Sequence, residues 1–331
     1  MAGYSLSKRS WLGVGVESTP GTALVAPTVY HPAKSIMKGT KKREQLKEER
    51  GNRDGVYGIV DTIREGAIDP KGPFYADTSP YFMLGAWGAV TSTQPDATNL
   101  PNVHKHTFAL ADQPKTLTLF KNYDAAVYVG AYAVVEKWTL KFAADGKVLE
   151  NDVALKHLYP VKYAGAQLTP TFSPVQPFAG YAPQITLGGV STLDIDDVMI
   201  EFDQKCTLWY PAGGSADFAA VYFGERTVKV DFTARFDTDA LYNHFFNGSR
   251  TDDSFTIDVK GPSLGVDGAN TYYQELNISV PIISYDSMDH DLSKDNVLIK
   301  AKATAISTAN QTGGSPMISA FVQNLVASYT V

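Results

Sequence analysis

The sequence predicts a mainly β protein, and three observations support this. Apolar and polar residues alternate with a period of two over much of the chain, which is typical of strands with one face in a core. Of the 331 residues, 44% are hydrophobic and 19% are charged, a composition that excludes a disordered chain. Helix signals occur in two segments, so we expect helices to be a minor part of the fold.

The clearest strand pattern covers residues 227–236, where Val228, Val230 and Phe232 fall on one face and Lys229 and Asp231 on the other. A second pattern of the same kind covers 198–208. Apolar residues and turn residues place further strands at 56–68, 105–110, 115–120, 126–143, 148–157, 254–260, 272–283, 296–307 and 318–330.

Two helices are predicted. The first follows the capping residues Asp77 to Ser79 and has Pro80 at an early helical position. The second occupies 237–248, with acidic capping residues at its start, an apolar face and Asn-Gly at its end. They lie nearly half the chain length apart, and each follows a strand.

The order of elements predicts an internal duplication, because strand, helix, several strands and a closing strand occur twice. Between the two sets lies a segment with five prolines, which leaves no room for a long strand. We therefore expect two similar β domains, residues 1–160 and 184–331, joined by a proline-rich linker at 161–183.

Residues 38–55 form a run of mixed charge with Leu46 as its one large apolar residue. One interpretation is a solvated hairpin or loop. The other is an arm that becomes ordered against a neighbouring copy through complementary charge. The candidates for that contact are Lys41, Lys42, Arg43, Glu44, Lys47, Glu48, Glu49 and Arg50.

Charge and cysteine content exclude several classes of protein. The net charge of −6 is opposite to the basic excess of a nucleic-acid-binding protein. One cysteine, Cys206, cannot form an internal disulfide, and it lies on the apolar face of a predicted strand, where a thiol is an inert packing group. No apolar run resembles a signal peptide or reaches the roughly 20 residues that span a bilayer, so no membrane partner is expected.

Motifs of catalysis are incomplete. Gly261 to Gly265 has the spacing of a hydrolase nucleophile elbow around Ser263, with Asp286 and His290 downstream, but a turn is expected there instead of a strand and a helix. Gly13 and Gly15 begin a dinucleotide motif that lacks its third glycine. We therefore predict no enzyme and no cofactor.

Metal motifs are also incomplete. Asp289, Asp291, Ser293 and Asp295 alternate like calcium ligands, but lysines stand at the positions that need glycine and glutamate, so a capped polar loop is expected. His104 and His106 share one strand face and would need a third ligand such as His157 to hold zinc. No metal site is predicted.

Three segments carry a resemblance to a known family. Gly13 to Ala23 (GVGVESTPGTA), followed by Ala26-Pro27-Thr28, resembles the N-terminal segment of major tail tube proteins from long, non-contractile tailed bacteriophages. The helix region 79–90 and the block from Val129 to Gly146 are similar to the family's helix and central strand pair. The resemblance covers most of residues 13–160 and contains no catalytic motif.

The resemblance implies a tail-tube-type β-sandwich or barrel with flanking short helices, in closed rings stacked into a hollow virion tube that conducts DNA. Two such domains in one chain would give a trimeric ring with pseudo-sixfold symmetry, and one domain a hexamer. The protein would be made in the host bacterial cytoplasm. A tape-measure protein and a tail terminator are the partners implied at the tube ends.

Repulsive or neutral walls let DNA slide, whereas a basic wall would retain it. The candidates for lumen positions are Glu201, Asp203, Lys229 and Asp231, although alternation alone fits an outer surface equally well. A carbohydrate-binding β-sandwich is the main alternative function, because the chain has 18 Tyr and 4 Trp. A serine hydrolase based on Ser263 is the third.

Overall fold

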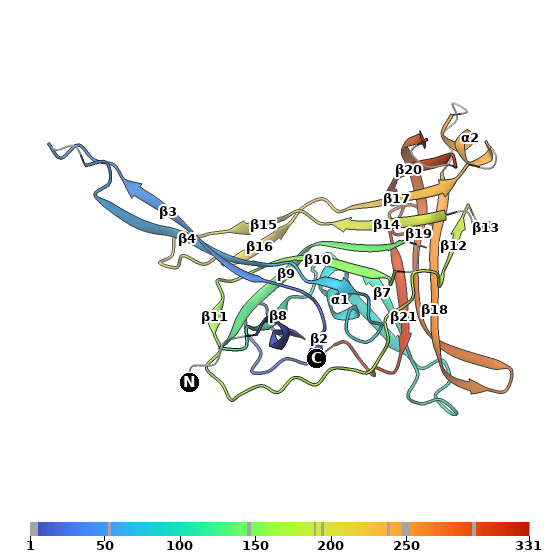
Figure 1. Cartoon of the computed structure of the whole chain (residues 1–331), viewed down its shortest axis with the longest axis horizontal. Coiled ribbons are helices and arrows are strands. Elements are labelled where there is room, and N and C mark those ends of the chain that lie inside the picture. Colours follow the sequence, from blue (N-terminus) through green and yellow to red (C-terminus); the bar gives the residue numbers. More distant parts are fainter. Residues whose placement is uncertain are drawn as a thin grey trace.

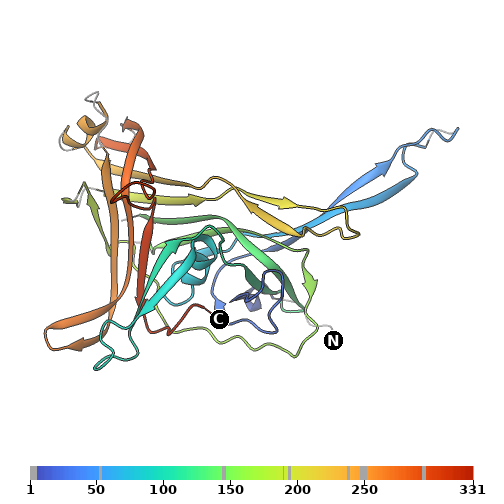
Figure 2. The ribbon, with the colours of Figure 1, turned by 180° about the vertical axis from the view of Figure 1, so that it is seen from behind.

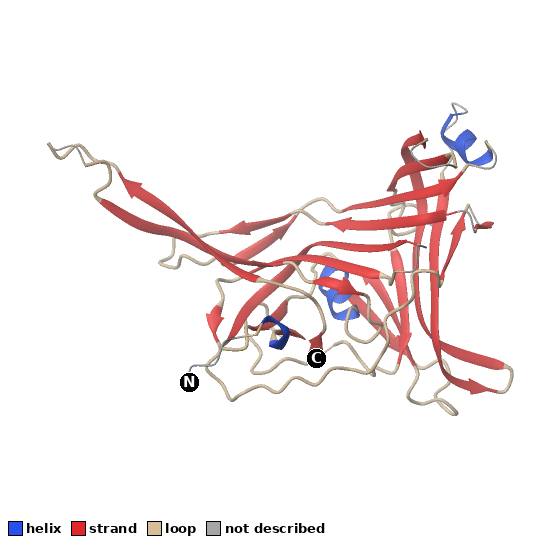
Figure 3. Cartoon of the chain, in the orientation of Figure 1, coloured by secondary structure: helices blue, strands red, loops and turns tan. Residues whose placement is uncertain are grey.

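The structure, a computed structural model, describes residues 6–51, 54–143, 147–188, 190–192, 195–236, 239–246, 252–292 and 296–330. Within these residues it contains 21 strands and two short α-helices. Hydrogen bonds connect 19 of the strands into one network, and the other two form a separate hairpin. This confirms the prediction of a mainly β protein (Figure 3).

The elements have the following bounds. The first half contains η1 (Ser7–Arg9), β1 (Trp11–Val16), β2 (Val29–His31), β3 (Met37–Leu46), β4 (Gly58–Ile68), β5 (Lys71–Pro73), α1 (Pro80–Trp87), β6 (Gly88–Thr93), β7 (His104–Leu110), β8 (Leu117–Asn122), β9 (Val127–Ala143) and β10 (Glu150–His157). The second half contains β11 (Val161–Lys162), β12 (Pro183–Leu187), β13 (Val190–Thr192), β14 (Ile195–Asp203), β15 (Cys206–Trp209), β16 (Ala220–Phe223), β17 (Thr227–Arg235), α2 (Ala240–Phe246), β18 (Asp253–Asp267), β19 (Asn270–Asp291), β20 (Leu298–Ala305) and β21 (Ser319–Asn324).

Eight strands follow one another across the main sheet in the order β3, β4, β10, β9, β14, β17, β20 and β19. Every neighbouring pair in this row is antiparallel. The first four strands come from the first half of the chain and the last four from the second half. The two halves therefore meet where β9 pairs with β14.

Smaller groups of strands extend this row. The beginning of β9 pairs with β8, which pairs with β1, and β1 pairs with β2. The beginning of β19 pairs with β18 and with β21, and β21 continues to β7 and β6. Strands β18 and β19 form the long hairpin at the right of Figure 1.

The main hydrophobic core includes residues from both halves, and a smaller cluster contains Trp11, Phe120 and Val129. Helix α1 lies inside the main core, because all eight of its residues are buried. Trp87 at its end packs edge-on against Trp138 of β9, with ring centroids 5.8 Å apart. The helix stops at Gly88, whose φ of 92° lies in the left-handed region that glycine adopts without strain.

Strands β3 and β4 form a long hairpin, here called the arm, that projects from the body at the end opposite α2 (Figures 1 and 2). Its strands pair from Met37 and Ile68 at the base to Leu46 and Gly58 near the tip. The charged run therefore lies in a hairpin, a geometry that fits both a solvated hairpin and an arm that contacts a neighbouring copy.

Several sequence expectations are confirmed, and others are wrong, including a single strand over 198–208, which the structure divides into β14 and β15. Val228, Val230 and Phe232 are buried, as the alternation predicts. Residues 261–265 do not form a turn, because β18 continues through them and the chain turns at Gly268, which has a φ of 56°. Asp289 and Asp291 do not lie in a capped loop, because cross-strand pairing with β20 extends β19 as far as Asp291.

Some predicted features fall outside the described residues. These are the turn at Asp145 and Gly146, the start and end of the second helix at Asp237 and at Asn247 with Gly248, and the polar residues Ser293 and Asp295. No helix among the described residues has the length and apolar character needed to cross a membrane.

Candidate functional site

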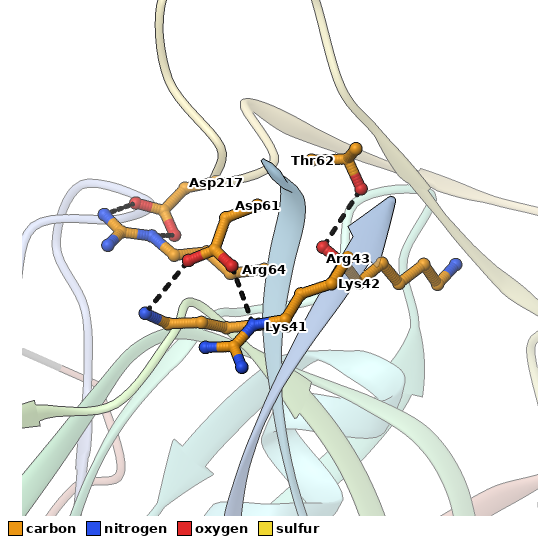
Figure 4. A network of polar contacts seen from close by, with 7 residues as sticks. All are labelled: Lys41, Lys42, Arg43, Asp61, Thr62, Arg64 and Asp217. Carbon is orange, nitrogen blue, oxygen red and sulfur yellow. Dashed lines mark hydrogen bonds and ion pairs between the residues drawn. The ribbon is translucent and has the colours of Figure 1, made fainter. Parts of the chain in front are cut away.

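The arm keeps its charged residues in solvent and pairs some of them within the hairpin. Arg43 on β3 donates to Asp61 on β4 at 2.8 Å, and Lys41 lies 3.4 Å from the same carboxylate (Figure 4). The Thr62 hydroxyl donates to the Lys42 carbonyl at 3.1 Å. These contacts hold the two strands together across an exposed hairpin that has no core of its own.

The predicted contact residues are distributed between strand and tip. Lys41, Lys42, Arg43 and Glu44 lie on β3, whereas Lys47, Glu48, Glu49 and Arg50 follow it in the segment that leads to the tip. All eight are exposed. The arm therefore presents both signs of charge along its length, and Asn52 and Arg53 of the charged run lie outside the described residues.

The arm also exposes apolar side chains that sequence reasoning missed. Ile59 is 58% exposed and Val60 49% exposed, both near the tip on β4. Residues 56–68 are expected as a strand with one buried face, and only the end of β4 at the body has that property. Because consecutive residues of a strand point to opposite faces, each face of the hairpin near its tip exposes one of these side chains.

A salt bridge braces the base of the arm against the second half of the chain. The Nε and Nη2 atoms of Arg64 in β4 each lie 2.6 Å from an oxygen of Asp217, which lies in the loop between β15 and β16 (Figure 4). Tyr210 in the same loop donates to Glu65 at 3.0 Å. Two adjacent residues of β4 are thus bound by one loop, which limits the directions in which the arm can point.

The four lumen candidates lie on the polar face of adjacent strands. Glu201 and Asp203 are on β14, and Lys229 and Asp231 are on β17, with Glu201 directly opposite Lys229. The Glu201 carboxylate also lies 2.6 Å from the amine of Lys137 on β9. The sheet therefore brings the four candidates onto neighbouring positions.

Lysines offset the carboxylates on this face. Burial raises the pKa of Asp231, while the nearby amines of Lys302 and Lys229 act to lower it. Farther along the face, the amine of Lys141 donates to Asp152 at 3.2 Å. The face thus carries alternating charges, a pattern that the net charge of the chain did not reveal.

Glu17 explains the N-terminal motif. Its buried carboxylate accepts hydrogen bonds from the Gly21 and Tyr132 amides and from the Thr116 and Thr118 hydroxyls, all at 2.8–2.9 Å. A buried carboxylate needs such donors to compensate for its lost hydration. The motif residue therefore fixes the segment after β1 to strands β8 and β9.

These structural features agree with a comparison of families. The chain matches the phage tail tube protein family over residues 7–323. It belongs to this family. The tail tube protein is a structural, non-enzymatic subunit of the virion tail that assembles with copies of itself. A search of curated proteins finds no match to the chain.

Cys206, His106 and His157 have structural roles in the tail tube protein. Burial raises the pKa of the Cys206 thiol to about 12. His106 is held by Ser92 and the Val326 carbonyl, each at 2.8 Å, while the His157 ring lies over Gly66, where a Cβ atom would come within 2.3 Å of it. Among the described residues, no group of three or more His, Cys, Asp or Glu side chains is arranged to hold a metal ion.

The tryptophans are packing residues in most cases. Trp11, Trp87 and Trp138 are buried, whereas Trp209 is 46% exposed. Carbohydrate-binding surfaces use exposed aromatic faces. Three of the four tryptophans therefore belong to the core and supply no exposed aromatic face to a carbohydrate.

Proposed function

We propose that this tail tube subunit contains two tandem tube modules and that three copies close into a ring with pseudo-sixfold symmetry. The rings stack into the tube of a long, non-contractile tail. The observation that carries the proposal is the order of strands in the main sheet. β3, β4, β10 and β9 are followed by β14, β17, β20 and β19. In each set, two paired strands come first. They are followed by a closing strand, β10 or β20, and then by the long strand that precedes it in the chain, β9 or β19.

Matching irregularities support the duplication. Where β9 pairs with β10, the register skips Glu136, and where β19 pairs with β20, it skips Asp286. Each extra residue is acidic and is bound by a side chain of the closing strand, Lys156 in the first case and Thr304 in the second. A bulge at the same place with the same partner position is difficult to explain without a common origin.

The proposed module boundaries are residues 1–160 and 184–331, with the linker at 161–183. After the two residues of β11, the linker contains no helix or named strand until β12 begins at Pro183. Two modules of four strands, used three times, supply 24 strands around a ring (3 × 8). A closed sheet of this kind has a large lumen.

We assign the polar face of β14 and β17 to the lumen. Its other face packs on the core, so the polar face is the one left to contact water. Lysines alternate with the carboxylates of Glu201 and Asp231, and such a wall neither binds DNA through many phosphate contacts nor repels it strongly. DNA would pass without specific binding.

We assign the arm to the contact between stacked rings. Its exposed charges and the apolar residues Ile59 and Val60 supply a surface that gains contacts when a second ring covers it. At the tube ends, a tape-measure protein and a tail terminator are the proposed partners, because a repeating subunit has no means of counting its copies.

Electron microscopy of rings, combined with native mass spectrometry, tests this proposal. We expect three chains in each ring and six similar lobes in averaged end views. Six chains in each ring would contradict the tandem arrangement, and a ring with three unlike lobes would contradict the equivalence of the two modules.

A further inference from the structure

At the two ends of the row, two strands of the main sheet each have an edge that no other described strand covers. Among the described residues, β3 pairs with β4 alone, and β19 beyond Ile283 pairs with β20 alone. Backbone groups at an open edge are a template for another strand. Because the two edges lie at opposite ends of the row, one copy can offer both to its neighbours.

The internal junction between β9 and β14 supplies a pattern for their pairing. There, residues 137–143 pair antiparallel with residues 197–203. If the modules are equivalent, as the proposed function holds, β19 corresponds to β9 and β3 corresponds to β14. The junction between copies then repeats the junction within the chain.

The matching bulges fix the register of this correspondence. Met288 lies opposite Ala301 of β20 as Trp138 lies opposite Val153 of β10, each two residues after the bulge. On the other side of the row, Met37 corresponds to Ile200. Met37 pairs with Ile68 of β4, which pairs with Leu155 of β10, and Ile200 pairs with Val230 of β17, which pairs with Ala303 of β20. Leu155 and Ala303 are equivalent, because each pairs with the residue just before the bulge.

We propose that residues 287–291 of one copy pair antiparallel with residues 36–40 of the next copy, with Lys38 opposite Asp289 and Met37 opposite His290. This inference rests on the proposed function, and it adds the surface and register by which copies join in a ring.

Charge and shape at the two edges support the proposed register. Lys38 and Asp289 are both exposed and carry opposite charges, so they become a cross-strand pair. Beside the edge of β3, a pocket of about 260 Å³ is lined by Met37, Gly39, Tyr123, Tyr128, Tyr159 and Pro160. His290, whose ring packs against Phe236 and Tyr242 in the single chain, would lie opposite Met37 beside this pocket.

In the single chain, a side chain closes the edge of β3. The Tyr123 hydroxyl accepts from the Met37 amide at 2.7 Å and donates to the Met37 carbonyl at 3.1 Å. In β14, the equivalent residue Ile200 lies opposite Leu140 of β9. Tyr123 thus satisfies the backbone groups that the proposed register gives to His290, and it protects the edge against premature pairing.

Disulfide cross-linking tests the register. In a Cys206→Ala background that forms tubes, we would introduce Lys38→Cys with Asp289→Cys, and as a matched control Lys42→Cys with Asp289→Cys. Cross-strand neighbours are close enough for a disulfide, whereas a partner four residues away is not. We expect oxidised tubes of the first pair to give covalently linked trimers on a non-reducing gel and the control to stay monomeric.

The outcomes separate this inference from the proposed function. Rings of three chains without a Lys38→Cys/Asp289→Cys cross-link, or with an equal cross-link in the control, would overturn the register and leave the proposed function standing. Rings of six chains with the cross-link would overturn the trimer and leave the edge pairing standing.

Charge exchange gives a second test that needs no new thiol. Lys38→Glu places two acidic side chains opposite each other and should reduce ring formation at least tenfold at low salt. Adding Asp289→Lys should restore it. Tyr123→Phe removes the hydroxyl that closes the edge and should speed ring formation. Failure of the exchange to restore assembly of a folded subunit would contradict the proposed pair.

Discussion

Arg64 and Asp217 form a two-bond ion pair between segments that lie 153 positions apart in the chain. Arg64 lies in β4 at the base of the arm, and Asp217 lies in the loop between β15 and β16. Their side chains are 41% and 23% exposed, so solvent weakens the pair's contribution to stability. Its geometric effect remains, because two parallel hydrogen bonds fix the orientation of the Arg64 guanidinium relative to Asp217.

Arg64→Ala and Asp217→Ala should each lower the free energy of unfolding by about 1 kcal/mol or less. They should slow tube assembly more than this loss explains, because the arm is no longer held in one direction. Urea denaturation and light scattering measure the two effects. Lys141→Ala, which breaks the similarly exposed pair of Lys141 with Asp152 outside the arm, is the control, and an equal delay in that variant would contradict the role of the brace.

Ile59→Ser should leave the subunit folded and prevent rings from stacking. The side chain is already exposed in the single chain, so its loss changes stability by no more than about 0.5 kcal/mol. Val266→Ser, at an apolar position of β18 outside the arm that is 61% exposed, should stack like the unchanged protein. Circular dichroism checks the fold and electron microscopy measures tube length; tubes of full length from Ile59→Ser would exclude this residue from the contact.

Glu17→Gln should destabilise the subunit by about 2–3 kcal/mol, because an amide group would place its own donors against donors that now bind a carboxylate. Thermal unfolding measures the loss. Glu44→Gln changes an exposed glutamate in the same way and should have almost no effect. A similar loss of stability in the two variants would show that the hydrogen bonds to the buried Glu17 carboxylate do not stabilise the subunit.

Glu201→Lys combined with Asp231→Lys should make tubes retain DNA. These changes remove two carboxylates from a face that already carries Lys137, Lys229 and Lys302, and the added charge binds phosphate with strong salt dependence. Retained DNA should resist nuclease if this face lines the lumen. DNA that binds equally well but remains fully digestible would place the face outside.

Glu275 should make stability depend on pH near neutrality. Burial, together with the neighbouring Asp258 carboxylate, raises its pKa to about 7. Because the folded state holds this proton at higher pH than the unfolded state, the stabilising contribution is complete at low pH and is lost as pH rises through about 7.

Thermal unfolding between pH 8 and pH 5.5 should therefore show a gain toward acid that Glu275→Gln lacks. His31 acts in the opposite direction, because burial lowers its pKa to about 3 and acid favours the unfolded state. The histidine is present in both proteins, so the difference between them isolates Glu275. Parallel pH curves for the two proteins would show that Glu275 does not titrate in this range.

The strands and the core were predictable where burial follows alternation. Val228, Val230 and Phe232 are buried in β17 as the period of two predicts, because one face of that strand meets the core. The same reasoning is wrong for residues 59 and 60 of β4, which continue past the edge of the core into the arm. A sequence pattern records side-chain type and does not record where the core ends.

The sequence by itself determined the fold class, the location of α1, the N-terminal motif and the absence of a complete catalytic motif, because these depend on residues close together in the chain. Only the tertiary structure revealed the charge pairs of Glu201, the brace between Arg64 and Asp217, and the edge of β3 closed by Tyr123. The contacts of Glu201 with Lys137, of Arg64 with Asp217 and of Tyr123 with Met37 join residues more than 60 positions apart, which chain folding brings together and local pattern does not encode.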